Sequence, residues 1–168
     1  MKNIINIYAD GSCGAGDDMG AWACFIVTPV NRKLLYGIQC PTTISRMELM
    51  PIIEGLVWLR RRWAKTVKNL DVQIYSDSEY VIKTMSGMYE PKKNMDLWNG
   101  FIETSQGFNL SFKWYERNKL PYMELCDSVC SVMRRSVIDF MTTQFGDIKN
   151  VEKAIPHAVE ATGGFNEK

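Results

Sequence analysis

The feature that most constrains the fold is a short motif that occurs twice, in which a strand-forming run ends at an aspartate. Residues 7–13 read IYADGSC and residues 74–79 read IYSDSE, so Asp10 and Asp77 follow the same Ile-Tyr-small lead-in. Either aspartate alone is ordinary turn chemistry, because a short acidic side chain can bond to the backbone of its own turn. Two matched copies instead indicate a shared purpose for acids at the ends of two strands.

The order of predicted elements indicates an α/β domain. Alternating apolar residues predict strands at 3–10, 20–28 and 32–40, which form an antiparallel meander with a glycine-rich turn at 11–19. The apolar spacing then becomes helical from residue 45 to about 65. The remaining elements are predicted as a strand at 70–77, helices at 78–85 and 95–106, a strand at 109–116 and a helix at 122–141. Strands that alternate with helices favour parallel crossover connections in this second half.

A third acid, Glu48, lies in the first long predicted helix. It shares a helix face with Ile52 and Leu59, so we expect its side chain to point toward the sheet. Burying an acid costs several kcal/mol unless it is paired or bound to a metal. The alternative is structural, because Ser45 and Glu48 fit a capping box. Pro51 weakens the helix prediction locally, since proline past the first turn loses a backbone hydrogen bond.

Crossover topology brings these acids to one edge of the sheet. If the strand at 70–77 is parallel to the first strand, Asp10 and Asp77 lie together at the carboxyl ends, where open α/β sheets bind ligands. Asp127 begins a helix in ELCDSVC, and its structural interpretation is an acid favoured by the helix dipole. Four converging acids cannot all ionise stably at neutral pH without a cation. Carboxylates without histidine or cysteine partners select magnesium or manganese rather than zinc.

The composition is that of an ordinary globular protein. The chain has 168 residues, of which 46% are hydrophobic and 23% charged, with a formal net charge of +1. It has one histidine and no CxxC pair, so a zinc site is not expected, and the cysteines are predicted to be buried reduced thiols: Cys13, Cys24, Cys40, Cys126 and Cys130. Without a signal peptide or membrane-spanning run, we expect a soluble cytoplasmic protein that does not bind membranes.

The segments IYADGSC, SRMELM, IYSDSEY, NMDLW and ELCDSVC occur in this order and together resemble the type 1 ribonuclease H family, over roughly residues 3–135. The resemblance implies a five-stranded mixed sheet flanked by helices, a catalytic domain at 1–141, and a polar, partly disordered extension at 142–168. It also implies two Mg²⁺ ions, replaceable by Mn²⁺, on four acids: Asp10, Glu48, Asp77 and Asp127. The implied reaction is hydrolysis of the RNA strand of an RNA–DNA hybrid by a monomer.

The resemblance also implies substrate contacts, and here the sequence departs from the family pattern. The matching positions are Gly11, Ser12, Cys13, Ser45, Arg46, Ser78, Glu79, Lys92 and Lys93. Family members often carry a histidine on the loop before the last acid, whereas this loop has none and His157 lies far downstream. The candidates to replace that histidine are Glu116, Arg117, Asn118 and Glu124.

Two other features have structural interpretations that we favour. The basic run Arg60, Arg61 and Arg62 is typical of a solvated helix end, and Trp98 and Trp114 are expected in the core. Two other functions remain open. One is a different nuclease on the same fold, such as a DNA resolvase or exonuclease, and the other is a non-catalytic nucleic-acid-binding scaffold domain.

Overall fold

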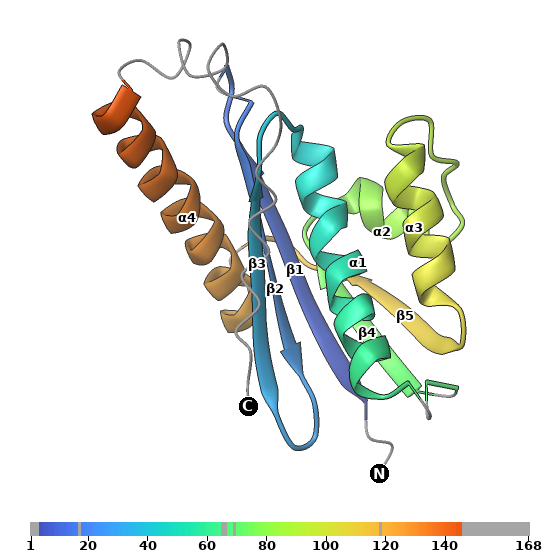
Figure 1. The fold of residues 1–168 in the computed structure, drawn as a ribbon. Coiled ribbons are helices and arrows are strands. Elements are labelled where there is room, and N and C mark those ends of the chain that lie inside the picture. The colour runs from blue at the N-terminus through green and yellow to red at the C-terminus, as the bar shows by residue number, and fades with distance from the viewer. Residues whose placement is uncertain (1–3, 17, 65–66, 69, 118, 146–168) are drawn as a thin grey trace.

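The computed structural model describes residues 4–16, 18–64, 67–68, 70–117 and 119–145 (Figure 1). The strands are β1 (Ile5–Cys13), β2 (Gly20–Val27), β3 (Arg32–Gln39), β4 (Leu70–Ser76) and β5 (Phe108–Trp114). The helices are α1 (Ile44–Arg62), α2 (Glu79–Met85), α3 (Met95–Ser105) and α4 (Pro121–Phe145). This order, three strands followed by helices and single strands, is the order predicted from the sequence.

One five-stranded mixed sheet organises these elements, in the order β3-β2-β1-β4-β5. β1 is antiparallel to β2, which is antiparallel to β3, and β1 is parallel to β4, which is parallel to β5. In the β1–β4 pair, Ile7 lies opposite Ile74 and Tyr8 opposite Tyr75. The two IY motifs are therefore in register, and the aspartates that follow them lie where the pairing of these two strands ends.

Helices cover both faces of the sheet, with α1, α2 and α3 on one side and α4 on the other (Figure 1). The alternation in β1 predicts which residues face α1, and Ile5, Ile7 and Ala9 are buried in the main core with Ile52 and Leu56 of α1. A smaller core under α4 includes Ala21, Ala23, Cys126 and Cys130. No helix among the described residues is long and apolar enough to cross a membrane.

The first strand is longer than predicted. β1 continues past Asp10 through Cys13, because Gly11, Ser12 and Cys13 pair with Trp22, Ala21 and Gly20 of β2. The prediction of a turn from residue 11 was therefore wrong at its start. A glycine read as a turn signal serves here to let β1 pass close to α1, since a Cβ on Gly11 would lie 2.2 Å from the backbone of Met47.

The helix boundaries also correct the sequence predictions. α1 is continuous through Pro51, and its N-cap residue is Thr43, without a side-chain capping bond, so the predicted Ser45–Glu48 capping box is absent. α4 begins at Pro121, which places Asp127 beyond the first turn, where Glu124 is the acid instead. α4 also reaches Phe145, past the predicted end at 141. The rest of the predicted extension, 146–168, lies outside the described residues.

The cysteine prediction holds for three of the five side chains. Cys24, Cys126 and Cys130 are buried thiols, whereas Cys13 and Cys40 are partly exposed, and none of the five is in a disulfide. Cys13 is the last residue of β1, and Cys40 directly follows β3. The one-turn spacing of Cys126 and Cys130 does place both on the sheet-facing side of α4.

Candidate active site

The four predicted acids come from four different elements. Asp10 lies in β1, Glu48 in the first part of α1, Asp77 directly after β4, and Asp127 in α4. The negative charges of Asp77 and Asp127 raise the pKa of Asp10, and the charge of Asp77 raises the pKa of Glu48. The fold therefore gathers the acids into one electrostatic cluster at the carboxyl ends of the parallel strands β1 and β4, as the sequence predicted.

Asp10 is the most deeply placed of the four. Its exposed fraction is only 3%, and one carboxylate oxygen accepts a hydrogen bond from the backbone N–H of Gly11 at 2.9 Å. Burial, followed by the charge of Asp77, raises the pKa of Asp10 from 3.8 to about 7. The Gly11 N–H and the Arg117 guanidinium offset only part of this effect. Without a bound cation, Asp10 is thus about half protonated near neutral pH.

Glu48 is held by a serine from the neighbouring helix. The Ser78 hydroxyl donates to Glu48 Oε2 at 2.8 Å, and Ser78 Oγ also caps α2 by accepting from the backbone N–H of Val81. Burial raises the pKa of Glu48, and the hydrogen bond from Ser78 lowers it in part. Ser78 was predicted as a substrate contact. Its hydroxyl holds Glu48 and caps α2, and its role as a substrate contact stays a prediction.

Asp77 is positioned through its backbone. The indole N–H of Trp114, the last residue of β5, donates to the Asp77 carbonyl at 2.9 Å. Trp114 is 50% exposed, so the prediction that it belongs to the core was wrong, whereas Trp98 is buried as expected. Burial raises the pKa of the Asp77 carboxyl, and the nearby Arg117 lowers it. A similar backbone contact supports Asp10, whose carbonyl accepts from the Cys130 thiol at 3.5 Å.

Arg117 is the cation of this cluster. Its Nη2 lies 2.5 Å from Asp127 Oδ1, and its Nε lies 3.9 Å from Asp77 Oδ2. These contacts raise the pKa of the Arg117 guanidinium, chiefly through the hydrogen bond to Asp127. The sequence had marked this loop residue as one of several candidates to replace a histidine. It did not indicate that Arg117 would bind two of the acids at once.

The four acids are of the residue type that binds divalent metals, but their side chains are not arranged around a common point. Among the described residues, no three acidic, histidine or cysteine side chains form a group that could hold a metal ion in this conformation. Arg117 meanwhile contacts two of the four acids. An all-carboxylate donor set that already attracts a cation fits a hard divalent ion.

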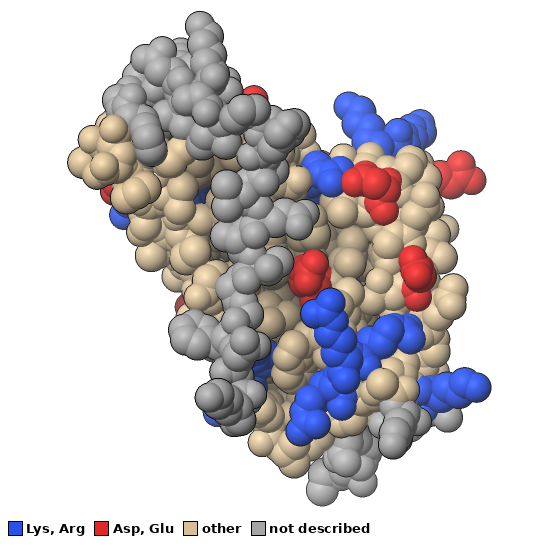
Figure 2. Space-filling model, in the orientation of Figure 1, with Lys and Arg blue, Asp and Glu red and all other residues tan. Residues whose placement is uncertain are grey.

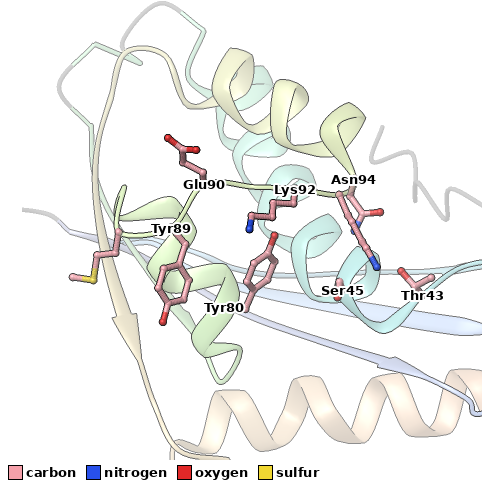
Figure 3. Close-up of a pocket in the computed structure, with 9 residues that line it drawn as sticks. Thr43, Ser45, Tyr80, Tyr89, Glu90, Lys92 and Asn94 are labelled. Atoms are coloured by element: carbon pink, nitrogen blue, oxygen red, sulfur yellow. The ribbon is translucent and has the colours of Figure 1, made fainter.

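A pocket of about 810 Å³ lies between the start of α1, α2 and the segment before α3 (Figure 3), and none of the four acids lines it. Three predicted substrate contacts line it, Ser45, Lys92 and Lys93. Figure 3 shows Tyr80 and Lys92 facing each other across the space. The sequence did not single out the other lining residues, which are Thr43, Tyr80, Met88, Tyr89, Glu90 and Asn94. An interleaved tyrosine-lysine pattern at 80–93 was the available signal.

The other predicted substrate contacts lie in different surroundings. Arg46 forms a two-point ion pair with Asp96 of α3, at 2.7 and 3.0 Å, and Glu79 forms an ion pair with Lys83 on the surface of α2. Gly11, Ser12 and Cys13 lie within the extended part of β1. Their roles in substrate binding stay predictions.

The candidates to replace the histidine differ in whether they contact the acids. Glu116 pairs with Lys119 at 3.7 Å, and both side chains are exposed. Glu124 lies in the first turn of α4 and is exposed. Arg117 is therefore the candidate that the structure places against the acids, while Asn118 and His157 lie outside the described residues.

The basic run of α1 lies away from the acids. Arg60, Arg61 and Arg62 form the last turn of this helix, and Figure 2 shows lysine and arginine side chains gathered over that end of the molecule. At 1.5 Å per residue, Glu48 and Arg62 are separated by about 20 Å along the helix. Arg60 donates to the Thr104 carbonyl at 2.8 Å. The run thus ends the helix and ties it to the end of α3, in agreement with a structural interpretation.

Comparisons with known proteins agree with this fold. A model of the RNase H family matches residues 2–118, a span that includes Asp10, Glu48 and Asp77 but stops before Asp127. A ribonuclease H of Pseudomonas fluorescens is 33% identical over 127 residues, covering 68% of this chain and 80% of that protein. A ribonuclease H of Cupriavidus metallidurans is 32% identical over 141 residues, covering 76% and 92% respectively.

A solved structure resembles the chain over most of its length. LC11-RNase H1, isolated from compost by a metagenomic approach, superimposes with a TM-score of 0.66 at 22% identity, covering 81% of this chain and 99% of that one. The same enzyme in complex with an RNA/DNA hybrid gives a TM-score of 0.65 at 20% identity, covering 80% of this chain and 99% of that one. At these identities the likeness concerns the fold. Together with the family match and the relatives above 30% identity, it leads to one conclusion: the chain belongs to the ribonuclease H family, as its motifs predicted.

Proposed function

We propose that this protein is an endonuclease that hydrolyses the RNA strand of RNA–DNA hybrids with the help of Mg²⁺. The observation that carries the proposal is the cluster of four acids where the parallel pairing of β1 and β4 ends, with Asp10 as its most buried member. Family membership supports the reaction, and the hybrid complex of LC11-RNase H1 supports the substrate.

The metal would be held by Asp10, Glu48, Asp77 and Asp127. Two divalent ions there would supply activation of the attacking water and stabilisation of the leaving 3′-oxygen. The protein's own contribution is positioning: Ser78 fixes Glu48, and Trp114 fixes the backbone of Asp77. Magnesium, replaceable by manganese, is the proposed metal because every donor is a carboxylate.

The pocket between α1, α2 and the segment before α3 supports nucleic-acid binding. Lys92 and Lys93 bring positive charge to it, and Tyr80 and Tyr89 bring aromatic faces. These side-chain types suit a strand's phosphates and its sugars or bases, respectively. Discrimination in favour of RNA would rest on ribose 2′-hydroxyls, which only the RNA strand presents near the scissile phosphate. A cytoplasmic location and a monomeric state stay predictions.

Cleavage of labelled substrates tests the proposal. An RNA–DNA hybrid, double-stranded DNA and double-stranded RNA are each incubated with Mg²⁺ and with a chelator. We expect cleavage of the hybrid alone, and only with metal. Asp77→Asn should abolish it, whereas Asp139→Asn, the same change at an exposed position of α4, should not. Replacing the 2′-hydroxyls near the scissile bond with hydrogen should stop cleavage.

The other outcomes separate the alternatives. Equal cutting of double-stranded DNA would replace hybrid hydrolysis with a resolvase-like or exonuclease activity. Binding of the hybrid without cleavage of any substrate, at any divalent metal concentration, would favour a scaffold domain. Full activity of Asp77→Asn would show that the acid cluster is not the catalytic site.

A further inference from the structure

Arg117 lies among the four acids that are proposed to bind the metal. Its guanidinium contacts Asp127 at 2.5 Å and Asp77 at 3.9 Å, and both are proposed metal ligands. The same positive charge also acts on Asp10 and Glu48. A single side chain is thus coupled to all four acids, in the place where a cation is required.

We propose that Arg117 is a built-in competitor of the divalent cation. In the metal-free protein its guanidinium holds Asp127 and neutralises part of the charge on Asp77. Metal binding at Asp127 then requires Arg117 to release that carboxylate. This inference rests on the proposed metal site, and it adds that the chain carries its own exchangeable cation for that site.

Three properties of Arg117 fit an exchangeable cation rather than a fixed structural one. It lies in the segment between β5 and α4, outside any helix or strand. Its side chain is 60% exposed, compared with 19% for Asp77 and 33% for Asp127, so it can swing into solvent without opening the core. Its hydrogen-bond partner is one carboxylate oxygen, whereas Arg46 grips Asp96 with two parallel bonds.

The chemistry of the two cations explains the exchange. A guanidinium binds a carboxylate through directional N–H donors and cannot lose its proton at neutral pH. It therefore offsets the repulsion among the acids at every pH at which they are ionised. A divalent ion brings twice the charge in a smaller volume, so it displaces the guanidinium once its concentration is high enough. The apparent metal affinity is lower than that of the acids alone, because binding must break the Arg117–Asp127 contact.

Calorimetric titration of Mg²⁺ and Mn²⁺ into the protein without nucleic acid tests the proposal. We compare wild type with Arg117→Met, Arg117→Lys and the control Lys119→Met, at fixed ionic strength. Lys119 lies on the same segment and carries the same charge, but its ion-pair partner is the exposed Glu116. Arg117→Met should bind metal about tenfold more tightly, the effect of losing one charge-assisted contact. Arg117→Lys should be intermediate, and Lys119→Met should match wild type.

A second readout follows the arginine directly. The Nε–Hε NMR signal of Arg117, assigned by its loss in Arg117→Met, should move when Mg²⁺ saturates the wild-type protein. Equal metal affinity in wild type and Arg117→Met, or an unmoved signal, would overturn the inference and leave the proposed function standing. An equal gain in Lys119→Met would reduce the effect to general charge and also overturn it. Absence of metal binding in every variant would overturn both the inference and the proposed metal site.

Discussion

The buried carboxyl of Asp10 makes a specific prediction about stability in the absence of metal. Its pKa is about 7 in the folded protein, against an ordinary value of 3.8. Between these two pH values the folded protein keeps a proton on Asp10 that the unfolded chain has lost. The contribution of Asp10 to stability must therefore fall as pH rises from about 4 to about 7, and stay low above that range.

The magnitude follows from the same two values. One pKa unit corresponds to about 1.4 kcal/mol, so the difference between 3.8 and about 7 corresponds to about 4 kcal/mol. Asp10 is only 3% exposed, so solvent screens little of this effect. Asp10→Asn removes the charge but keeps an oxygen that can accept the N–H of Gly11. We expect this variant to be more stable than wild type by about 4 kcal/mol at pH 8, and nearly equal to it at pH 4.

Urea unfolding in chelator, from pH 4 to pH 8, measures this difference. The gap between wild type and Asp10→Asn isolates Asp10, because other groups that titrate in this range are common to both proteins. Asp139→Asn, at an exposed site on α4, serves as the control and should follow wild type throughout. Adding Mg²⁺ at pH 8 should narrow the gap, since a bound cation stabilises the ionised form. Equal stability of wild type and Asp10→Asn at pH 8 would refute the reasoning.

Three further variants test how the site is positioned. Gly11→Ala should destabilise the protein by about 3 kcal/mol in urea unfolding, because its Cβ would meet the backbone of α1 at 2.2 Å, whereas Gly100→Ala has open space and should be neutral or stabilising. Ser78→Ala should lower the free energy of unfolding by about 1–3 kcal/mol and reduce cleavage, since it removes both the cap of α2 and the donor to Glu48. Ser78→Thr keeps a hydroxyl and should restore stability and cleavage. Trp114→Phe should lose about 1 kcal/mol by removing one hydrogen bond, with a smaller loss of cleavage than Asp77→Asn.

The elements of the sheet were predictable because their signals are local. The two-residue alternation of β1 gave its buried face, and Ile7 and Ala9 are fully buried on it. The matched IY motifs predicted that β1 and β4 are parallel neighbours, which the structure confirms. The prediction rested on the acid in each motif, because two such acids come together only when their strands run in the same direction side by side. The error at 11–13 came from a residue type that is read as a break. Gly11 instead permits a close approach of β1 to α1, and α1 also continues through Pro51, where the helix prediction was weakest.

The contacts that tune the acids were not predictable, because they join residues far apart in the chain. Ser78 and Glu48 are 30 residues apart, and Trp114 and Asp77 are 37 apart. In sequence, a serine after a strand-ending acid indicates a substrate contact, and a tryptophan ending a strand indicates the core. Only the packing of α2 near α1, and of β5 beside β4, turns these residues toward the acids.

These contacts have a common physical origin in the repulsion among the acids. Burial and mutual charge raise the pKa values of Asp10, Glu48 and Asp77, so the metal-free site destabilises the fold. Each of these acids has a nearby group that offsets part of this effect: the Gly11 N–H, the Ser78 hydroxyl and the Arg117 guanidinium, respectively. The first two are neutral and can remain when a cation binds. The third is itself a cation, so it is the compensating group whose role must change on metal binding.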